Sequence, residues 1–264
     1  MLSSPRLNVL GVPFDAVSLE SAVGRLEQAC EGHEQLFCVT PNPEICLIAH
    51  HDRRYLETLR SAQLSFADGF GILWVGRYLA GKRTFLRWIW TLLTPWWTKH
   101  SSPFPERVTG TDVMQSFCDR YRSRKIFLLG ASPDVNERLF RGLKHDGVNV
   151  VGHFSGDESV SMETQICSMI NTSGAEVLFV AFGAPKQEFW IARNFSALTT
   201  VRVAIGVGGA FDFLVGKKRR APRWMRSLGL EWIFRLLIEP RRIGRILRAT
   251  IVFPWTVLLR GKKM

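Results

Sequence analysis

Residues 177–188 read VLFVAFGAPKQE. Six apolar residues come first, Gly183 ends the run, and polar residues that suit the start of a helix follow. A short, wholly apolar run that a glycine turn ends is typical of a strand covered on both faces. This stretch therefore predicts one strand–turn–helix unit of a parallel sheet.

The same pattern recurs on both sides of this stretch. Further apolar runs lie at residues 36–39, 64–66, 125–129, 148–153 and 201–207, with a short single strand expected at 7–12. Most of these runs lead through small or polar residues into a helical pattern. We therefore expect an α/β fold, a Rossmann-like, mostly parallel sheet with helices on both faces. In such sheets, ligands bind beyond the carboxyl ends of the strands.

Charge divides the chain into two parts. The 264 residues carry a net charge of +12, and the segment from residue 217 onward holds 14 Lys or Arg against two acids, Glu231 and Glu239. That segment therefore holds the whole excess, and the rest sums to zero. We expect an α/β domain over residues 1–216 and a basic helical appendage over 217–264, which meets a polyanion or an anionic membrane surface.

Arginines recur at helical spacing in this tail, with apolar residues on the opposite side. The spacing predicts a basic amphipathic helix at a membrane surface, and the alternative is a solvated charged face. No run reaches the roughly 18 apolar residues of a membrane-spanning helix. The N-terminus lacks the pattern of a signal peptide. The arginines are Arg241, Arg242, Arg245 and Arg248, and the apolar residues are Ile243, Ile246, Leu247 and Ile251.

Residues 81–107 interrupt the alternation of strands and helices. They are rich in Trp, Pro and basic residues. We expect a loop or short amphipathic helix that projects from the body, and the alternative is a Trp-rich core helix.

Cofactor and metal signatures are missing from the sequence. It has no P-loop, no complete dinucleotide fingerprint, no HExxH, no DxD and no Cys/His cluster. The five cysteines form no CxxC pair and suit buried thiols. We expect no cofactor and no metal.

Several polar or glycine-rich turns follow the predicted strands. Asp68 stands between a strand end and Gly69, where its carboxylate suits a general base or, alternatively, a helix N-cap. The turns at Gly130, Gly183 and 208–209 each allow a phosphate to approach a helix N-terminus. After Gly183, Gln187 suits the reading of a base or sugar edge. The alternative there is a solvated helix start, with Glu188 in the first turn.

Taken together, seven stretches resemble those of the WecG/TagA/CpsF family of bacterial glycosyltransferases, in the same order. The similarity spans about residues 36–247. The matching stretches are residues 40–44, 66–71, 106–112, 127–130, 182–188, 206–212 and 220–242. The sequence departs from the family pattern at Pro43, at 153–158 and in the long 81–105 segment.

The resemblance implies an inverting, metal-independent enzyme. It would move a hexose, of the ManNAc, ManNAcA or glucose type, from a UDP-sugar donor to a polyprenyl-diphosphate-linked sugar acceptor. The product would enter cell-surface polysaccharide or exopolysaccharide synthesis. The implied location is cytoplasmic, peripheral on the inner face of the bacterial plasma membrane. The resemblance leaves open whether the chain forms a homo-oligomer.

Motif matching assigns roles to individual residues. By this match, Asp68 corresponds to the family's general base. Arg235, Arg242 and Arg245 correspond to its catalytic arginines, which contact the diphosphate. The predicted substrate-binding residues are Thr40, Asn42, Gly69, Arg107, Thr111, Asp112, Gly130, Lys186, Gln187, Gly208 and Gly209.

Two other functions compete with this reading. Interleaved arginines and aromatic residues also suit a nucleic-acid-binding tail, although a neutral body and the amphipathic spacing disfavour nucleic acid as a partner. A nucleotide-dependent oxidoreductase lacks its fingerprint here.

Overall fold

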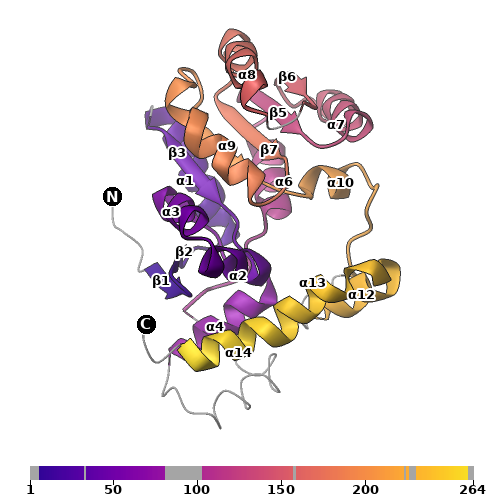
Figure 1. Ribbon diagram of the computed structural model, residues 1–264. Coiled ribbons are helices and arrows are strands. Elements are labelled where there is room, and N and C mark those ends of the chain that lie inside the picture. The colour runs from indigo at the N-terminus through magenta and orange to yellow at the C-terminus, as the bar shows by residue number, and fades with distance from the viewer. Residues whose placement is uncertain are drawn as a thin grey trace.

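The computed structural model describes residues 6–32, 34–80, 103–156, 159–222, 224–225 and 230–260. A six-stranded sheet of order β4-β3-β8-β7-β5-β6 forms its centre, and every neighbouring pair is parallel. The predicted α/β sheet is confirmed (Figure 1). The strands are β3 (Leu36–Val39), β4 (Leu64–Ser65), β5 (Ile126–Gly130), β6 (Val150–Phe154), β7 (Val177–Ala181) and β8 (Val203–Gly206).

Helices cover both faces of this sheet, as predicted. One face carries α2 (Pro43–His51), α3 (Arg53–Ser61), α4 (Phe70–Leu79), α8 (Val160–Ser173) and α9 (Lys186–Asn194). The other face carries α1 (Leu19–Gly32), α6 (Gly110–Arg120), α7 (Pro133–His145) and α10 (Ala210–Leu214). All strands point the same way, so the turns after them share one edge of the sheet.

Strand β7 shows how the apolar runs build two cores. Val177 and Phe179 lie in one core, whereas Leu178 and Val180 lie in the other, and all four are fully buried. Successive side chains of a strand point to opposite faces, so a strand covered on both sides must be apolar throughout. This is why residues 177–182 contain no polar side chain.

The N-terminal strand prediction is wrong. Residues 7–12 do not form one strand but span the turn of an antiparallel hairpin, β1 (Arg6–Val9) and β2 (Val12–Asp15). Leu10 and Gly11 both have positive φ, +52° and +94°, which reverses the chain. The Asn8 side-chain oxygen accepts the Gly11 N–H at 2.8 Å and holds the turn.

The Trp-rich interruption can be followed only in part. Of the predicted segment 81–107, residues 81–102 lie outside the described residues. Phe104, just after them, is buried and meets the Phe14 ring edge-on, with centroids 6.2 Å apart.

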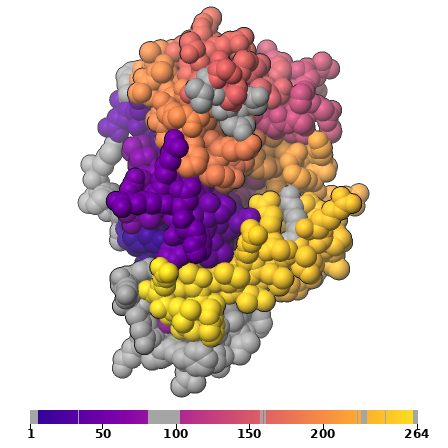
Figure 2. Space-filling view, viewed as in Figure 1, coloured from indigo at the N-terminus to yellow at the C-terminus, as the bar shows by residue number. Residues whose placement is uncertain are grey.

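The basic tail is helical, as predicted, and lies along the body as a yellow band in Figure 2. Its last helix packs against the body, because Phe253 and Val257 are fully buried in the core that also contains Ile72 of α4. The tail elements are α12 (Glu231–Ile238), η3 (Pro240–Arg242), α13 (Ile243–Leu247), the π-helical turn η4 (Arg248–Val252) and α14 (Phe253–Arg260).

The rest of the tail exposes apolar side chains. Within the described residues, the exposed large apolar side chains all lie between 224 and 259. Of the predicted apolar face only Ile246 is buried, whereas Ile243, Leu247 and Ile251 are 44–60% exposed. We call this set the tail's apolar surface. It comprises Trp224, Trp232, Leu237, Ile238, Ile243, Leu247, Ile251, Val252, Trp255 and Leu259.

No helix in the described part of the chain is long and apolar enough to cross a membrane. The five cysteines are all buried free thiols, as expected.

Candidate active site

Asp68 lies just beyond β4, beside the end of β3. Its backbone N–H donates to the carbonyl oxygens of Pro41 (3.2 Å) and Phe66 (3.0 Å). The N-cap of the following helix is Gly69, whose φ of +101° lies in the region that favours glycine. The alternative role of Asp68 as the helix N-cap is therefore wrong. Its half-buried carboxylate belongs instead to a group of charges.

This carboxyl group holds its proton more tightly than usual. Burial raises the pKa of Asp68 from an ordinary value of 3.8 to about 6. Arg107 and Arg235 act in the opposite direction and lower the pKa, whereas Glu231 and Asp112 raise it. Loss of hydration disfavours the charged form, and here that effect is the largest. Asp68 is therefore mostly ionised at pH 7 and still more basic than an ordinary aspartate, which suits a general base.

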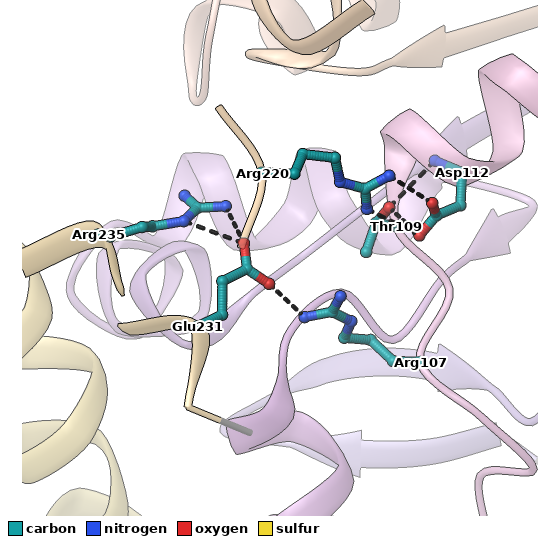
Figure 3. Close-up of polar contacts among 6 residues, drawn as sticks. All are labelled: Arg107, Thr109, Asp112, Arg220, Glu231 and Arg235. Atoms are coloured by element: carbon teal, nitrogen blue, oxygen red, sulfur yellow. Dashed lines mark hydrogen bonds and ion pairs between the residues drawn. The ribbon is translucent and has the colours of Figure 1, made fainter. Parts of the chain in front are cut away.

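Glu231 of the tail forms an ion pair with Arg107 of the body (Figure 3). Arg107 Nη1 donates to Glu231 Oε2 at 2.7 Å, and Arg235 Nε donates to Glu231 Oε1 at 3.0 Å. The side chains of Arg107 and Glu231 are only 18% and 16% exposed. The Arg235 guanidinium also lies over the Phe213 ring, 5.4 Å from its centroid. Two predicted site residues from distant parts of the chain therefore converge on one carboxylate.

A second ion pair borders this group (Figure 3). Arg220 donates to both oxygens of Asp112, at 2.7 and 3.1 Å, and the Thr109 hydroxyl donates to one of them at 2.7 Å. Burial alone would raise the pKa of Asp112, but these hydrogen bonds outweigh it and hold the pKa below its usual range. Asp112 thus lies at the site as a paired anion. Thr111 is buried in the same first turn of α6.

Thr40 and Asn42 follow β3 at the same edge of the sheet. The Thr40 hydroxyl donates to the Gly206 carbonyl oxygen of the neighbouring strand at 3.0 Å. Asn42 Oδ1 accepts the Ile45 N–H at 3.0 Å and so caps α2. Both side chains therefore fix the turn that lies beside Asp68.

Other predicted residues lie farther along this edge. Gly130 is the last residue of β5, four strand positions from β4, which corresponds to roughly 19 Å at about 4.8 Å per strand. Its φ is +96°, and a Cβ atom there would lie 2.9 Å from the Ala181 carbonyl carbon. Only glycine fits this turn. The structure thus separates Gly130 from Asp68 along one continuous edge.

Gln187 is buried between two glycine turns. Its Oε1 accepts the backbone N–H groups of Gly183 (3.2 Å) and Gly208 (3.0 Å). Gln187 is only 2% exposed. It therefore ties the turn after β7 to the turn after β8. Lys186 begins α9 next to it, and Gly209 takes the N-cap position of α10.

The alternative interpretation, a solvated helix start with Glu188 in its first turn, is wrong. Glu188 is 1% exposed and accepts hydrogen bonds from Gln187 Nε2 (2.7 Å) and the Tyr55 hydroxyl (3.0 Å). Helix α3 covers the first turn of α9 and supplies Tyr55. Burial raises the pKa of Glu188 above its usual range.

The predicted arginines of the tail do not form one cluster. Arg245 donates to both carboxylate oxygens of Glu44 in α2, with distances of 2.7–2.9 Å. Arg235 is held by Glu231 instead. The side chain of Arg242 lies outside the described residues.

Sequence reasoning missed Glu231, Arg220 and Tyr55. Glu231 carried a signal, because an acid among 14 basic residues is a natural ion-pair partner for a neighbouring arginine. Arg220 lies in a family-like stretch, but nothing pointed to Asp112 as its partner. Nothing around Tyr55 in the sequence marks a buried hydroxyl.

Among the described residues, no three His, Cys, Asp or Glu side chains form a group that could hold a metal ion. The site combines a partly buried carboxyl group of raised pKa with neighbouring arginines, on a Rossmann-like sheet.

Comparison with known proteins shows the class of enzyme: the chain is a glycosyltransferase. It belongs to the glycosyl transferase WecG/TagA/CpsF family, whose model matches residues 7–95 and 84–264. The resemblance predicted from the sequence is confirmed.

Curated relatives match over almost their whole length. Three of them are N-acetylglucosaminyldiphosphoundecaprenol N-acetyl-beta-D-mannosaminyltransferases from Staphylococcus aureus strains MRSA252, NCTC 8325 and MW2. Each is 29% identical over 267 residues, which cover 99% of this chain and 96% of the relative.

Proposed function

We propose that this chain transfers N-acetylmannosamine from a UDP-sugar to N-acetylglucosamine linked to undecaprenyl diphosphate, with inversion and without a metal ion. The names of the relatives support the sugar and the acceptor. The observation that carries the chemistry is Asp68, half-buried with a pKa near 6, beside Arg107 and Arg235.

The proposed reaction is a single displacement. Asp68 takes the proton from a hydroxyl group of the acceptor sugar while that oxygen attacks the anomeric carbon of the donor. The bond from this carbon to the β-phosphate oxygen breaks, and UDP leaves with the electron pair. Attack from the face opposite the leaving group inverts the anomeric centre. A beta-linked product, as in the name of the relatives, would then follow from an α-linked donor.

The arginines would stabilise the charge that develops on UDP. Arg107 and Arg235 lie close enough to Asp68 to affect its pKa, so both are near the reacting atoms in this proposal. Fixed guanidinium groups in a partly buried site stabilise a leaving diphosphate without reorganising. This is the work that a divalent cation does in many other transferases.

Sheet topology supports a location for the nucleotide. The helix after β5 leads outward to β6, whereas the helix after β7 leads the other way to β8, so the strand order reverses between β5 and β7. Ligands of open α/β sheets bind at such a switch point. We propose that uridine binds near Gly130 and Gly183, and that the donor extends past Gly208 toward Asp68.

The tail's apolar surface suits a membrane that carries the acceptor. Isolated exposed apolar side chains are ordinary, but here those of the described residues all lie in one segment that also holds the chain's excess positive charge. Apolar and basic side chains together favour the interface of an anionic bilayer. We propose that this surface rests on the cytoplasmic face of the membrane.

The test of the function is a donor panel. The purified chain would be given UDP-N-acetylmannosamine, UDP-N-acetylglucosamine, UDP-N-acetylmannosaminuronic acid and UDP-glucose. The acceptor would be a short-chain polyprenyl-diphosphate-linked N-acetylglucosamine, and EDTA would be present. We expect transfer from UDP-N-acetylmannosamine and a β linkage by NMR. No transfer, or transfer only after a divalent cation is added, would contradict the proposal.

A further inference from the structure

Glu231 stands at the only place among the described residues where two arginines from the body and the tail share one carboxylate. Each of its oxygens accepts from a different arginine, Oε2 from Arg107 and Oε1 from Arg235. Arg107 precedes α6, while Glu231 and Arg235 are one helical turn apart on α12.

We propose that Glu231 is a positioning residue for sugar transfer: its carboxylate holds Arg107 and Arg235 in fixed orientations near Asp68. This inference rests on the proposed function of the site. It assigns Glu231 no contact with the substrate.

The geometry favours this role over simple anchoring of the tail. The tail is held to the body elsewhere, by Phe253 in the core and by the ion pair of Arg245 with Glu44. Glu231 instead binds two arginines that lie close enough to Asp68 to lower its pKa. Arginine carries several donors in a rigid fork, so a carboxylate that takes some of them fixes the direction of the rest.

Charge balance around Asp68 supports the same role. The charged groups that affect Asp68 are Arg107, Arg235, Glu231 and Asp112, and they come from α12, from α6 and from the segment before α6. Glu231 offsets part of the positive charge of the two arginines. Without it, the arginines would stabilise ionised Asp68 more strongly, and the base would be weaker.

The test compares Glu231→Gln with Glu239→Gln, which removes the same charge from the same tail. Glutamine keeps the shape of the side chain and one acceptor oxygen. In Glu231→Gln we expect kcat/KM for UDP-N-acetylmannosamine to fall by about 10- to 100-fold, because misdirected arginines cost transition-state stabilisation. We expect Glu239→Gln to stay within about twofold of the unmodified enzyme.

Two further readouts separate positioning from a structural role. The acid limb of the pH profile of kcat/KM should move to lower pH in Glu231→Gln, because removing a neighbouring anion lowers the pKa of Asp68. In an Arg235→Ala background, Glu231→Gln should cost much less than in the unmodified enzyme, because coupled residues are not additive. Limited proteolysis should leave the tail as resistant as before.

Three results would overturn the inference. One is equal activity of Glu231→Gln and Glu239→Gln. The second is tighter binding of UDP by Glu231→Gln with unchanged kcat, which would make the carboxylate a competitor of the diphosphate. The third is a tail that becomes sensitive to protease, which would make Glu231 an anchor. If the unmodified enzyme transfers no sugar, the proposed function itself fails, which is a different outcome.

Discussion

The body and the tail are built by different forces. In the body, strands such as β7 bury every side chain in one of two cores. In the tail, α12 and α13 each form an ion pair with the body, Arg107 with Glu231 and Arg245 with Glu44. Only α14 joins the body through fully buried apolar side chains.

This difference separates stability from function along the tail. Apolar burial at α14 contributes to the folded state, whereas the ion pairs of α12 bring charge to the base. The tail's apolar surface is exposed, and in our proposal it rests on a membrane. Substitutions in the three regions should therefore have different consequences, which the following variants test.

The largest effect is expected at the base itself. Asp68→Asn should lower kcat by about 10²- to 10⁴-fold, because the amide cannot accept the acceptor's proton. Since burial raises the pKa of Asp68, its ionisation at pH 7 costs stability that the neutral amide avoids. The melting temperature should therefore not fall. Steady-state kinetics and thermal unfolding check both expectations. Near-normal activity would contradict the assignment of Asp68 as the general base.

The buried side of α14, where the tail packs against the body, should behave like part of the hydrophobic core. Phe253 is 0% exposed, and Phe253→Ala should lower the free energy of unfolding by about 3–5 kcal/mol through lost burial and a new cavity. Chemical denaturation would measure this. A loss below about 1 kcal/mol would mean that α14 is not part of the body's core.

The ion-paired part of the tail should affect catalysis more than stability. Arg235→Ala should lower kcat by about 100-fold, because a donor to the leaving group is lost. Arg248→Ala is the matched control, since Arg248 is an exposed arginine of the same tail. It should change kcat by less than about twofold on a water-soluble acceptor. Equal losses in the two variants would indicate general charge attraction rather than a directed contact.

The smallest effect on stability is expected at the tail's apolar surface. Trp255 is 51% exposed, only two residues from Phe253. Trp255→Ala should change the free energy of unfolding by about 0.5 kcal/mol or less, while co-sedimentation with anionic liposomes weakens. Unchanged liposome binding in Trp255→Ala, or preferential binding of the tail to RNA, would contradict the membrane proposal.

Sequence patterns predicted the sheet well, because two-sided burial leaves a local mark. The run 177–182 is apolar for that reason, and its strand forms as expected. The hairpin of residues 6–15 was missed because a two-residue turn at Leu10 and Gly11 lies inside a mostly apolar run. A turn that short leaves little trace in a hydrophobic pattern.

The site was predicted as a set of residues but not as a set of contacts. Motifs predicted Asp68 and Arg235 as site residues, whereas the pair of Arg107 and Glu231 spans 124 positions in the sequence. Similarly, Gln187 follows a glycine turn at the start of a helix, yet it is buried and its Oε1 accepts the N–H of Gly208 in the turn after β8. Both contacts join residues that are far apart in the sequence, so no local sequence pattern predicts them.

The pH dependence of kcat/KM for the unmodified enzyme tests the central claim most directly, namely that Asp68 is the base and works among charges from body and tail. The base must be ionised, and burial raises the pKa of Asp68 to about 6. We predict that kcat/KM falls about tenfold per pH unit below that value and is level above it until other groups titrate. A profile that stays flat from pH 8 down to pH 5 would contradict the account.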